Sequence, residues 1–162
     1  MTQLSFDTRR IRAISLDLDD TLWPIVPTIV RAEEQLKRWL AQHAPATATL
    51  ATQGPANKLA RDFVLAHHAD KLHDFSHLRR ETIRHLLGQA GDDPALAEPA
   101  FDEFFAWRQK VDLYADALPA LQALAARYPL VALSNGNADI ERVGLAPYFQ
   151  GAKLLIAADC TA

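Results

Sequence analysis

Three aspartates lie within four residues at the end of an apolar run near the start of the chain. The run IRAISL begins at residue 11 and leads into Asp17, Asp19 and Asp20. Two carboxylates two positions apart at a strand end can both reach one site, which places a nucleophile beside an acid. An aspartate can attack phosphorus to form an aspartyl phosphate. A dense carboxylate cluster also needs a hard cation such as Mg²⁺.

A second apolar run, LVAL from residue 130, ends at Ser134 and Asn135. Ligands of open α/β sheets bind at the carboxyl ends of the strands, so we expect these residues to share a site with Asp17. Ser134, followed by backbone N–H groups near a helix start, is suited to hold a phosphate oxygen. Two local alternatives stay open: an acidic helix cap after the first run, and a simple turn serine after the second.

The elements that must position these residues alternate strands with helices. Apolar spacing of three and four predicts helices that begin near residues 28, 59, 78 and 101, the third of them closed by Gly88 and Gly91, and no strand pattern interrupts them. The residues beyond them are predicted as a helix over 117–127, a strand over 130–134, a helix over 137–143 and a strand over 153–158. This order predicts an α/β fold with right-handed crossovers and a helical insertion.

The sequence divides at two composition changes. We expect a discontinuous core of residues 1–22 and 113–162, with an all-helical cap over 23–112 whose helices are interrupted by the Ala/Thr/Pro-rich stretch 44–56 and by GDDP at 91–94. Aromatic residues at helical spacing are predicted to form the core of the cap: Trp39, Phe63, Phe101, Phe104 and Phe105.

Composition excludes several classes of protein. A chain of 162 residues with 49% apolar residues and a net charge of −3 is neither disordered nor collagen-like, and its charge gives no support for a nucleic-acid partner. The single cysteine, Cys160, forms no internal disulfide. No signal peptide and no apolar run of about 18 residues is found, so we expect a cytoplasmic protein with no membrane partner.

Basic and aromatic residues of the cap offer weaker candidates for substrate contact. Trp107 and Arg108 lie near the return from cap to core and are ranked first, with core packing of Trp107 as the alternative. Arg79, Arg80 and Arg84 either reach an anionic substrate or form an exposed basic helix face.

The strand-end motifs are similar to those of the haloacid dehalogenase-like (HAD) hydrolase superfamily. ISLDLDDTLWP resembles its first motif and LVALSNGN its second, and the helical insertion resembles a type 1 cap. The resemblance implies a Rossmann-like core with a parallel sheet. It also implies phosphoryl transfer, because the dehalogenase members lack the second acid that stands here as Asp19.

The resemblance implies a role for each residue of the two motifs. Asp17 would be the nucleophile, and Asp19 the general acid that protonates the leaving group and then activates water. The Asp17 side chain and the Asp19 main-chain carbonyl would bind magnesium. Thr21 would support Asp19 and contribute to phosphate binding. Ser134 and the Asn135 backbone would bind the phosphate.

A narrower resemblance suggests a substrate. LDLDDTLWPIVPTI, WRQKVD and YPLVALSNGNADIERVGLAPYF resemble bacterial phosphatases that act on 5-amino-6-(5-phospho-ribitylamino)uracil. The expected activity is therefore a Mg²⁺-dependent phosphomonoester hydrolase of small phosphorylated metabolites, including a flavin-pathway sugar-phosphate type of substrate.

The sequence departs from the superfamily pattern after Phe149. The expected third-motif lysine and fourth-motif acid pair are not found, since Lys153 precedes an apolar run and Asp159 is a lone acid. We therefore expect a truncated or frameshifted member, and the alternative function is a catalytically impaired fragment or a phosphate-binding module. We also expect the first strand to have one unpaired edge, which would allow self-association.

Overall fold

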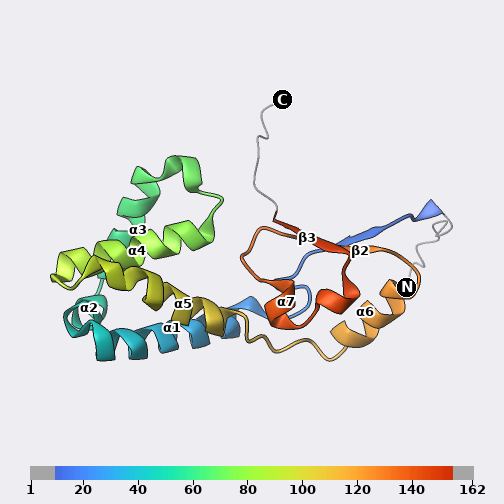
Figure 1. Cartoon of the computed structure of the whole chain (residues 1–162), viewed down its shortest axis with the longest axis horizontal. Coiled ribbons are helices and arrows are strands. Elements are labelled where there is room, and N and C mark those ends of the chain that lie inside the picture. The colour runs from blue at the N-terminus through green and yellow to red at the C-terminus, as the bar shows by residue number, and fades with distance from the viewer. Residues whose placement is uncertain (1–9, 155–162) are drawn as a thin grey trace.

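A three-stranded parallel sheet forms the centre of the core region in the computed structural model, which describes residues 10–154 (Figure 1). The strands are β1 (Ile14–Leu16), β2 (Leu130–Ser134) and β3 (Gly151–Leu154), in the order β1-β2-β3. Leu16 lies opposite Ala132 in parallel strands, so the residues that follow β1 and β2 lie together at the carboxyl ends of the strands. The α/β fold with an inserted helical region is confirmed.

The core region packs its helices against this sheet. The helices are α6 (Ala117–Ala125) and α7 (Ile140–Val143). The buried residues of this cluster are Leu18, Leu22, Trp23, Ala117, Leu121, Leu130, Ala132, Leu145 and Phe149. Within residues 10–154 β1 has a strand neighbour on one edge only, so self-association through its other edge stays a prediction.

Five helices form the inserted cap, which lies to one side of the sheet (Figure 1). They are α1 (Ile25–His43), α2 (Pro45–Ala51), α3 (Ala56–His67), α4 (Phe75–Ala90) and α5 (Ala97–Arg108). Short 3₁₀ turns occur at Ala69–Lys71, Pro94–Leu96 and Ala146–Tyr148. Ala32, Leu36 and Leu40 recur every four residues, so one face of α1 packs against α5 and α4.

Local residue chemistry explains two differences from the predicted helices. The stretch 44–56 contains the helix α2, because Pro45 at its first turn has the fixed φ that a helix start needs. Gly88 does not close α4, which runs to Ala90. Its end is instead Gly91, at φ 81°, where the left-handed conformation terminates the helix.

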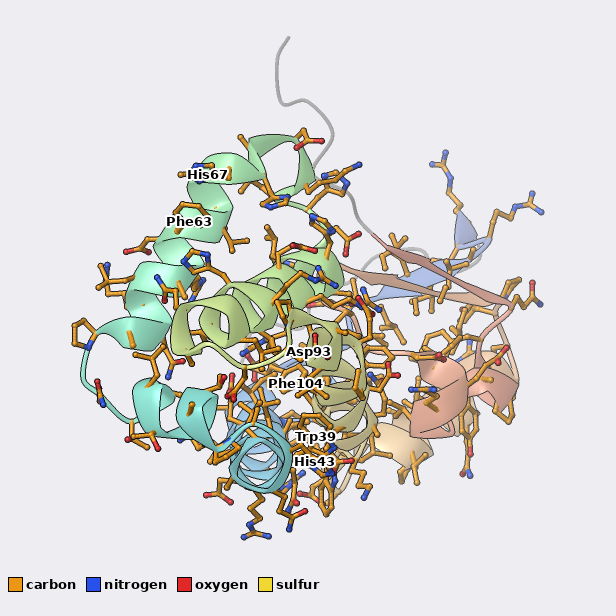
Figure 2. The ribbon with its side chains drawn as sticks, turned by 60° about the vertical axis from the view of Figure 1, so that its left-hand side comes forward. Trp39, His43, Phe63, His67, Asp93 and Phe104 are labelled. Carbon is orange, nitrogen blue, oxygen red and sulfur yellow. The ribbon has the colours of Figure 1, made fainter. Side chains whose placement is uncertain are left out.

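Three further predictions are corrected by the structure. Phe63 is 45% exposed and stacks on His67 and His85 instead of joining the cap core (Figure 2). The third strand begins at Gly151, and the remainder of the segment predicted as strand lies outside the described residues. Helix α7 begins at Ile140 because the Asp139 carboxylate caps its first turn.

None of the helices within residues 10–154 is both long and apolar enough to cross a membrane.

A buried hydrogen-bonded pair holds α2 against the end of α4. Thr47 is fully buried, and its N–H and hydroxyl both donate to Asp92 Oδ2, at 2.8 and 2.7 Å. We expect Thr47→Val to lower the free energy of unfolding by about 1.5–3 kcal/mol, since a hydrogen bond to a charged group is lost without a change of shape. Urea denaturation measures this. Thr49→Val, at an exposed position of the same helix, is the control and should change stability by less than about 0.5 kcal/mol.

Candidate active site

Asp17 is the first residue after β1 and faces the cleft between the core and the cap. Its neighbour Leu18 is 2% exposed and packs in the core, so the chain turns with Leu18 inward and the Asp17 side chain outward. The Leu18 N–H donates to Asp17 Oδ1 at 2.8 Å, which fixes one carboxylate oxygen. Asp17 is exposed and lines the cleft, so a substrate can reach its carboxylate.

Asp19 is held by two donors from different parts of the chain. The indole N–H of the fully buried Trp23 donates to Asp19 Oδ1 at 2.9 Å. Arg108 Nη2 lies 2.7 Å from Oδ1 and 2.6 Å from Oδ2. The Asp19 side chain is 16% exposed and that of Arg108 only 2%. The carboxylate therefore has a defined orientation at the wall of the cleft.

Asp20, the third acid of the cluster, serves the start of helix α1. Its φ is 59°, the left-handed conformation that aspartate tolerates better than most residues. Its Oδ1 accepts the N–H of Ile25 at 2.9 Å. Asp20 therefore supports the first turn of α1, and it also lines the cleft with Asp17 and Asp19.

The loop after β2 approaches Asp19 closely. Ser134 is 6% exposed, and its Oγ accepts the N–H of Gly136 at 3.1 Å, so it makes the turn that serines favour after strands. A Cβ on Gly136 would lie 2.3 Å from Asp19 Oδ2 and 3.5 Å from Arg108 Nη2. Only a glycine fits between these groups. The exposed Asn135 lines the cleft beside it.

The segment that returns from the cap joins both strand-end loops. Arg108, the last residue of α5, contacts Asp19, and the next residue, Gln109, is 5% exposed. Gln109 Oε1 accepts the N–H of Asp139 at 2.8 Å, and its Nε2 donates to the Asn137 carbonyl at 3.4 Å. Sequence reasoning placed Gly136 at the end of the second strand but gave it no role, and it missed Asn137 and Gln109. The signal was available in the stretches WRQKVD and LVALSNGN, where they stand beside predicted residues.

Two predicted residues are not brought into contact with the acids. Thr21 is exposed, and no hydrogen bond of its hydroxyl is recorded within residues 10–154. Trp107 packs against the cap core, donates to Glu103 Oε1 at 3.0 Å and carries Lys110 Nζ 3.3 Å from its ring centroid. The Lys153 side chain and all of Asp159 lie outside the part of the chain that can be described.

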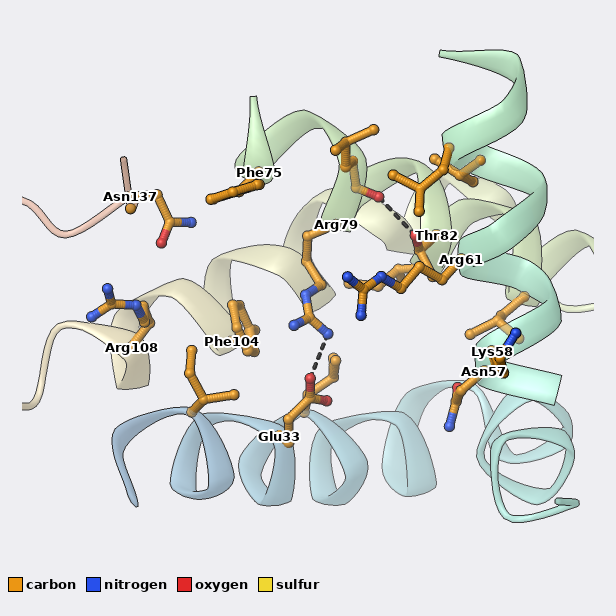
Figure 3. Close-up of a pocket in the computed structure, with 18 of the residues that line it drawn as sticks. Glu33, Asn57, Lys58, Arg61, Phe75, Arg79, Thr82, Phe104, Arg108 and Asn137 are labelled. Carbon is orange, nitrogen blue, oxygen red and sulfur yellow. Dashed lines mark hydrogen bonds and ion pairs between the residues drawn. The ribbon is translucent and has the colours of Figure 1, made fainter. Parts of the chain in front are cut away.

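The cleft has a volume of about 1170 Å³. The acids, Arg108 and the loop after β2 line its core end, and helices α1, α3 and α4 line its cap end (Figure 3). Arg79 points into the cap end, whereas Arg80 and Arg84 bind Glu98 outside it, so the three arginines do not share one role.

One family model matches almost the whole of this chain. Residues 11–159 match the model of the haloacid dehalogenase-like hydrolases, which covers both strand-end motifs and the whole cap. The chain belongs to this family.

Two relatives with different names share about a third of this hydrolase's residues. The 5-amino-6-(5-phospho-D-ribitylamino)uracil phosphatase YigB of Escherichia coli (strain K12) is 32% identical over 145 residues, which are 87% of this chain and 60% of that protein. A structure described as 2-haloacid dehalogenase, from Pseudomonas syringae pv. Tomato DC3000, is 36% identical, with a TM-score of 0.82 over 89% of this chain and 64% of that one. This HAD chain therefore spans less than two thirds of either relative.

A more distant structure confirms the fold alone. The HAD-hydrolase YfnB from Bacillus subtilis, solved bound to magnesium, is 17% identical, with a TM-score of 0.57 over 90% of this chain and 65% of that one.

The donor atoms of the site suit a hard cation of the type that HAD hydrolases use. Asp17 presents an exposed carboxylate to the cleft, and carboxylate and carbonyl oxygens are the ligands that Mg²⁺ prefers. Within the described residues no group of three His, Cys, Asp or Glu side chains gathers to hold a metal. The site therefore suits Mg²⁺ by the chemistry of its donor atoms, and Asp17 is the side chain that would hold the ion.

The close approach at Gly136 can be tested against a second glycine. We expect Gly136→Ala to lower the free energy of unfolding by about 1–3 kcal/mol, because its Cβ would overlap the Asp19 carboxylate. Gly88→Ala, in α4 with open space around its Cβ, should instead raise it by about 0.5–1 kcal/mol. Equal effects of the two substitutions in chemical denaturation would contradict the close approach.

Proposed function

We propose that this HAD hydrolase is a Mg²⁺-dependent phosphomonoesterase that works through an aspartyl phosphate on Asp17. The observation that carries the proposal is the meeting of Asp17, Asp19 and the buried guanidinium of Arg108 in one cleft. A nucleophilic carboxylate, a second carboxylate for proton transfer and a fixed cation are the groups that phosphoryl transfer needs.

The reaction takes two displacements. An Asp17 carboxylate oxygen attacks phosphorus while the bond to the leaving oxygen breaks, and Asp19 in its acid form gives that oxygen its proton. The Asp19 carboxylate then takes a proton from water as the water oxygen attacks the phosphorus, which releases phosphate and restores Asp17. When bound at Asp17, magnesium would neutralise charge on the phosphoryl oxygens.

Arg108 supplies a donor that the protein itself does not use. Its Nη2 binds Asp19, while its Nη1 is buried with no hydrogen-bond partner in the described part of the chain. Leaving such a donor unpaired is costly, so a phosphoryl oxygen that reaches it gains a charge-assisted hydrogen bond. We infer that Arg108 binds the phosphoryl group together with the Ser134 loop.

The substrate class is a small phosphorylated metabolite, and the first compound to test is 5-amino-6-(5-phospho-D-ribitylamino)uracil. The identity to the phosphatase that acts on it extends over 87% of this chain, cap included. The size of the cleft is consistent with a leaving group much larger than phosphate.

Two other functions have their own support. The likeness to a 2-haloacid dehalogenase makes halide release from a 2-haloacid the second candidate. A phosphate-binding module without turnover is the third, because Arg108 is the cation that contacts Asp19 within residues 10–154 and no metal-ligating triad is found there. Phosphate release, chloride release from 2-chloropropionate and phosphate binding alone distinguish the three.

The nucleophile can be tested by isosteric substitution. We expect Asp17→Asn to abolish phosphate release from p-nitrophenyl phosphate, because the amide lacks the attacking oxyanion, and Asp19→Asn to lower kcat by about 10²-fold or more. EDTA should abolish turnover in the wild type and Mg²⁺ should restore it. Full activity of Asp17→Asn would end this mechanism.

A control variant can separate phosphate binding by Arg108 from its part in attaching the cap to the core. We expect Arg108→Met to lower kcat/KM for p-nitrophenyl phosphate by about 10²–10³-fold, the usual effect of removing a donor to developing charge. Arg31→Met is the matched control, since Arg31 also ties the cap to the return segment, through Asp112 at 2.6 Å and the Lys110 carbonyl at 2.8 Å, and does not line the cleft. It should keep activity within about threefold. A comparable loss in both variants would assign Arg108 to anchoring alone.

A further inference from the structure

We propose that Glu33 and Arg79 form a recognition site for a planar, uncharged ring that carries an N–H beside a C=O, at the far end of the leaving group. The proposal rests on the phosphatase function above and names the chemistry of its substrate. Both residues line the cap end of the cleft and come from helices on opposite sides of it, α1 and α4 (Figure 3).

The pair has an arrangement suited to reading an amide edge. Arg79 Nη1 donates to Glu33 Oε1 at 2.5 Å, and the two side chains are 31% and 34% exposed. No other hydrogen bond of either side chain is recorded within residues 10–154, so further guanidinium N–H groups and Glu33 Oε2 remain for a ligand. The guanidinium can donate to a carbonyl oxygen while the carboxylate accepts a ring N–H.

Charge favours a neutral ligand at this point. Glu33 already balances the charge of Arg79, so a second anionic group on the substrate would meet the Glu33 carboxylate. Arg61 and Lys37 also line the cleft, but both are exposed and screened by solvent, and Lys58 is paired with Asp62 at 2.5 Å. Arg61 extends toward Arg79 in the view of Figure 3. A partly exposed ion pair of this kind adds at most about 1 kcal/mol to stability, so folding alone gives little reason for it to be here.

One partly exposed aromatic ring provides the flat surface that a planar ligand needs, and a buried ring positions Arg79. The Arg79 guanidinium lies 4.3 Å from the Phe104 ring centroid, which holds its plane. Phe75 lies one turn before Arg79 on α4, is 49% exposed and lines the same cleft. An exposed phenyl ring in a cleft is a stacking surface for another ring. In Figure 3 the Phe104 ring lies between Arg108 and Arg79, and the Phe75 ring lies above it.

Arg80 provides a matched comparison on the same helix. Its Nε lies 3.1 Å from Glu98 Oε2 and its guanidinium 3.9 Å from the Phe101 ring centroid, so it has the same two kinds of contact as Arg79. Neither Arg80 nor Glu98 lines the cleft. Substitutions of this second pair therefore report what losing such contacts does to the fold alone.

The test measures binding of a phosphate-free probe, which does not depend on turnover. Isothermal titration of the full chain with 5-amino-6-(D-ribitylamino)uracil, which has the amide-edged ring, is compared with ribitol, which lacks it. We expect the ring compound to bind at least about tenfold more tightly. Glu33→Gln and Arg79→Met should each weaken it about tenfold to a hundredfold, whereas Glu98→Gln and Arg80→Met should leave it unchanged.

The outcomes separate this proposal from the proposed function. Equal binding of the two probes, no detectable binding of the ring compound, or equal losses in the Arg79 and Arg80 variants would overturn ring recognition. Thermal unfolding of each variant checks that it folds, and Glu33→Gln gives an independent result if Arg79→Met does not. Phosphate release from p-nitrophenyl phosphate in the same wild-type sample tests the phosphatase function by itself.

Discussion

The buried contact between Arg108 and Asp19 is the interaction on which the site depends. The 2% exposed guanidinium needs acceptors close by, because a buried charge without hydrogen-bond partners costs several kcal/mol, and both Asp19 oxygens supply them. Arg108 ends the last cap helix, and Asp19 follows the first strand, 89 positions earlier in the chain. The pair therefore determines where the cap ends relative to the sheet. The pair fixes the position of the cap more than it stabilises the fold, because the desolvation of both charged groups offsets most of their attraction.

Polar contacts reinforce this position where the chain crosses between the two regions. Gln109 binds the loop after β2, and Arg31 binds the return segment from the start of α1. The apolar clusters on either side are separate, one within the cap and one around the sheet. The cleft exists because two packed regions are joined by a few directional polar contacts and not by a continuous apolar core.

This arrangement separates two chemical tasks along one cleft. At its core end the Arg108 guanidinium is buried, and the Asp19 carboxylate is held by Arg108 and by the indole N–H of Trp23. At its cap end Glu33 and Arg79 are each about one third exposed, and they come from two different cap helices, α1 and α4. Fixed charges suit a reacting phosphoryl group, whereas partly solvated pairs suit recognition of a neutral group.

Much of the fold and part of the site could be predicted from the sequence, because the information is local. Apolar runs that end in Asp17 and Ser134 are strands followed by polar loops, and apolar residues spaced three or four apart specify the cap helices. The pattern also located Arg108 near the return from the cap. The helix at Pro45 was missed because Ala, Thr and Pro also occur in linkers, and its burial depends on Asp92.

Tertiary structure alone decided which side chains meet. Nothing in the sequence indicates that Arg108 binds Asp19, that Gly136 must lack a Cβ because a carboxylate lies there, or that Asp20 accepts the first N–H of α1. Arg79 and Arg80 are adjacent and chemically identical, yet only Arg79 lines the cleft, because successive helix positions point about 100° apart. The sequence by itself determined the elements and the types of reactive group, and packing of the cap on the core determined their partners.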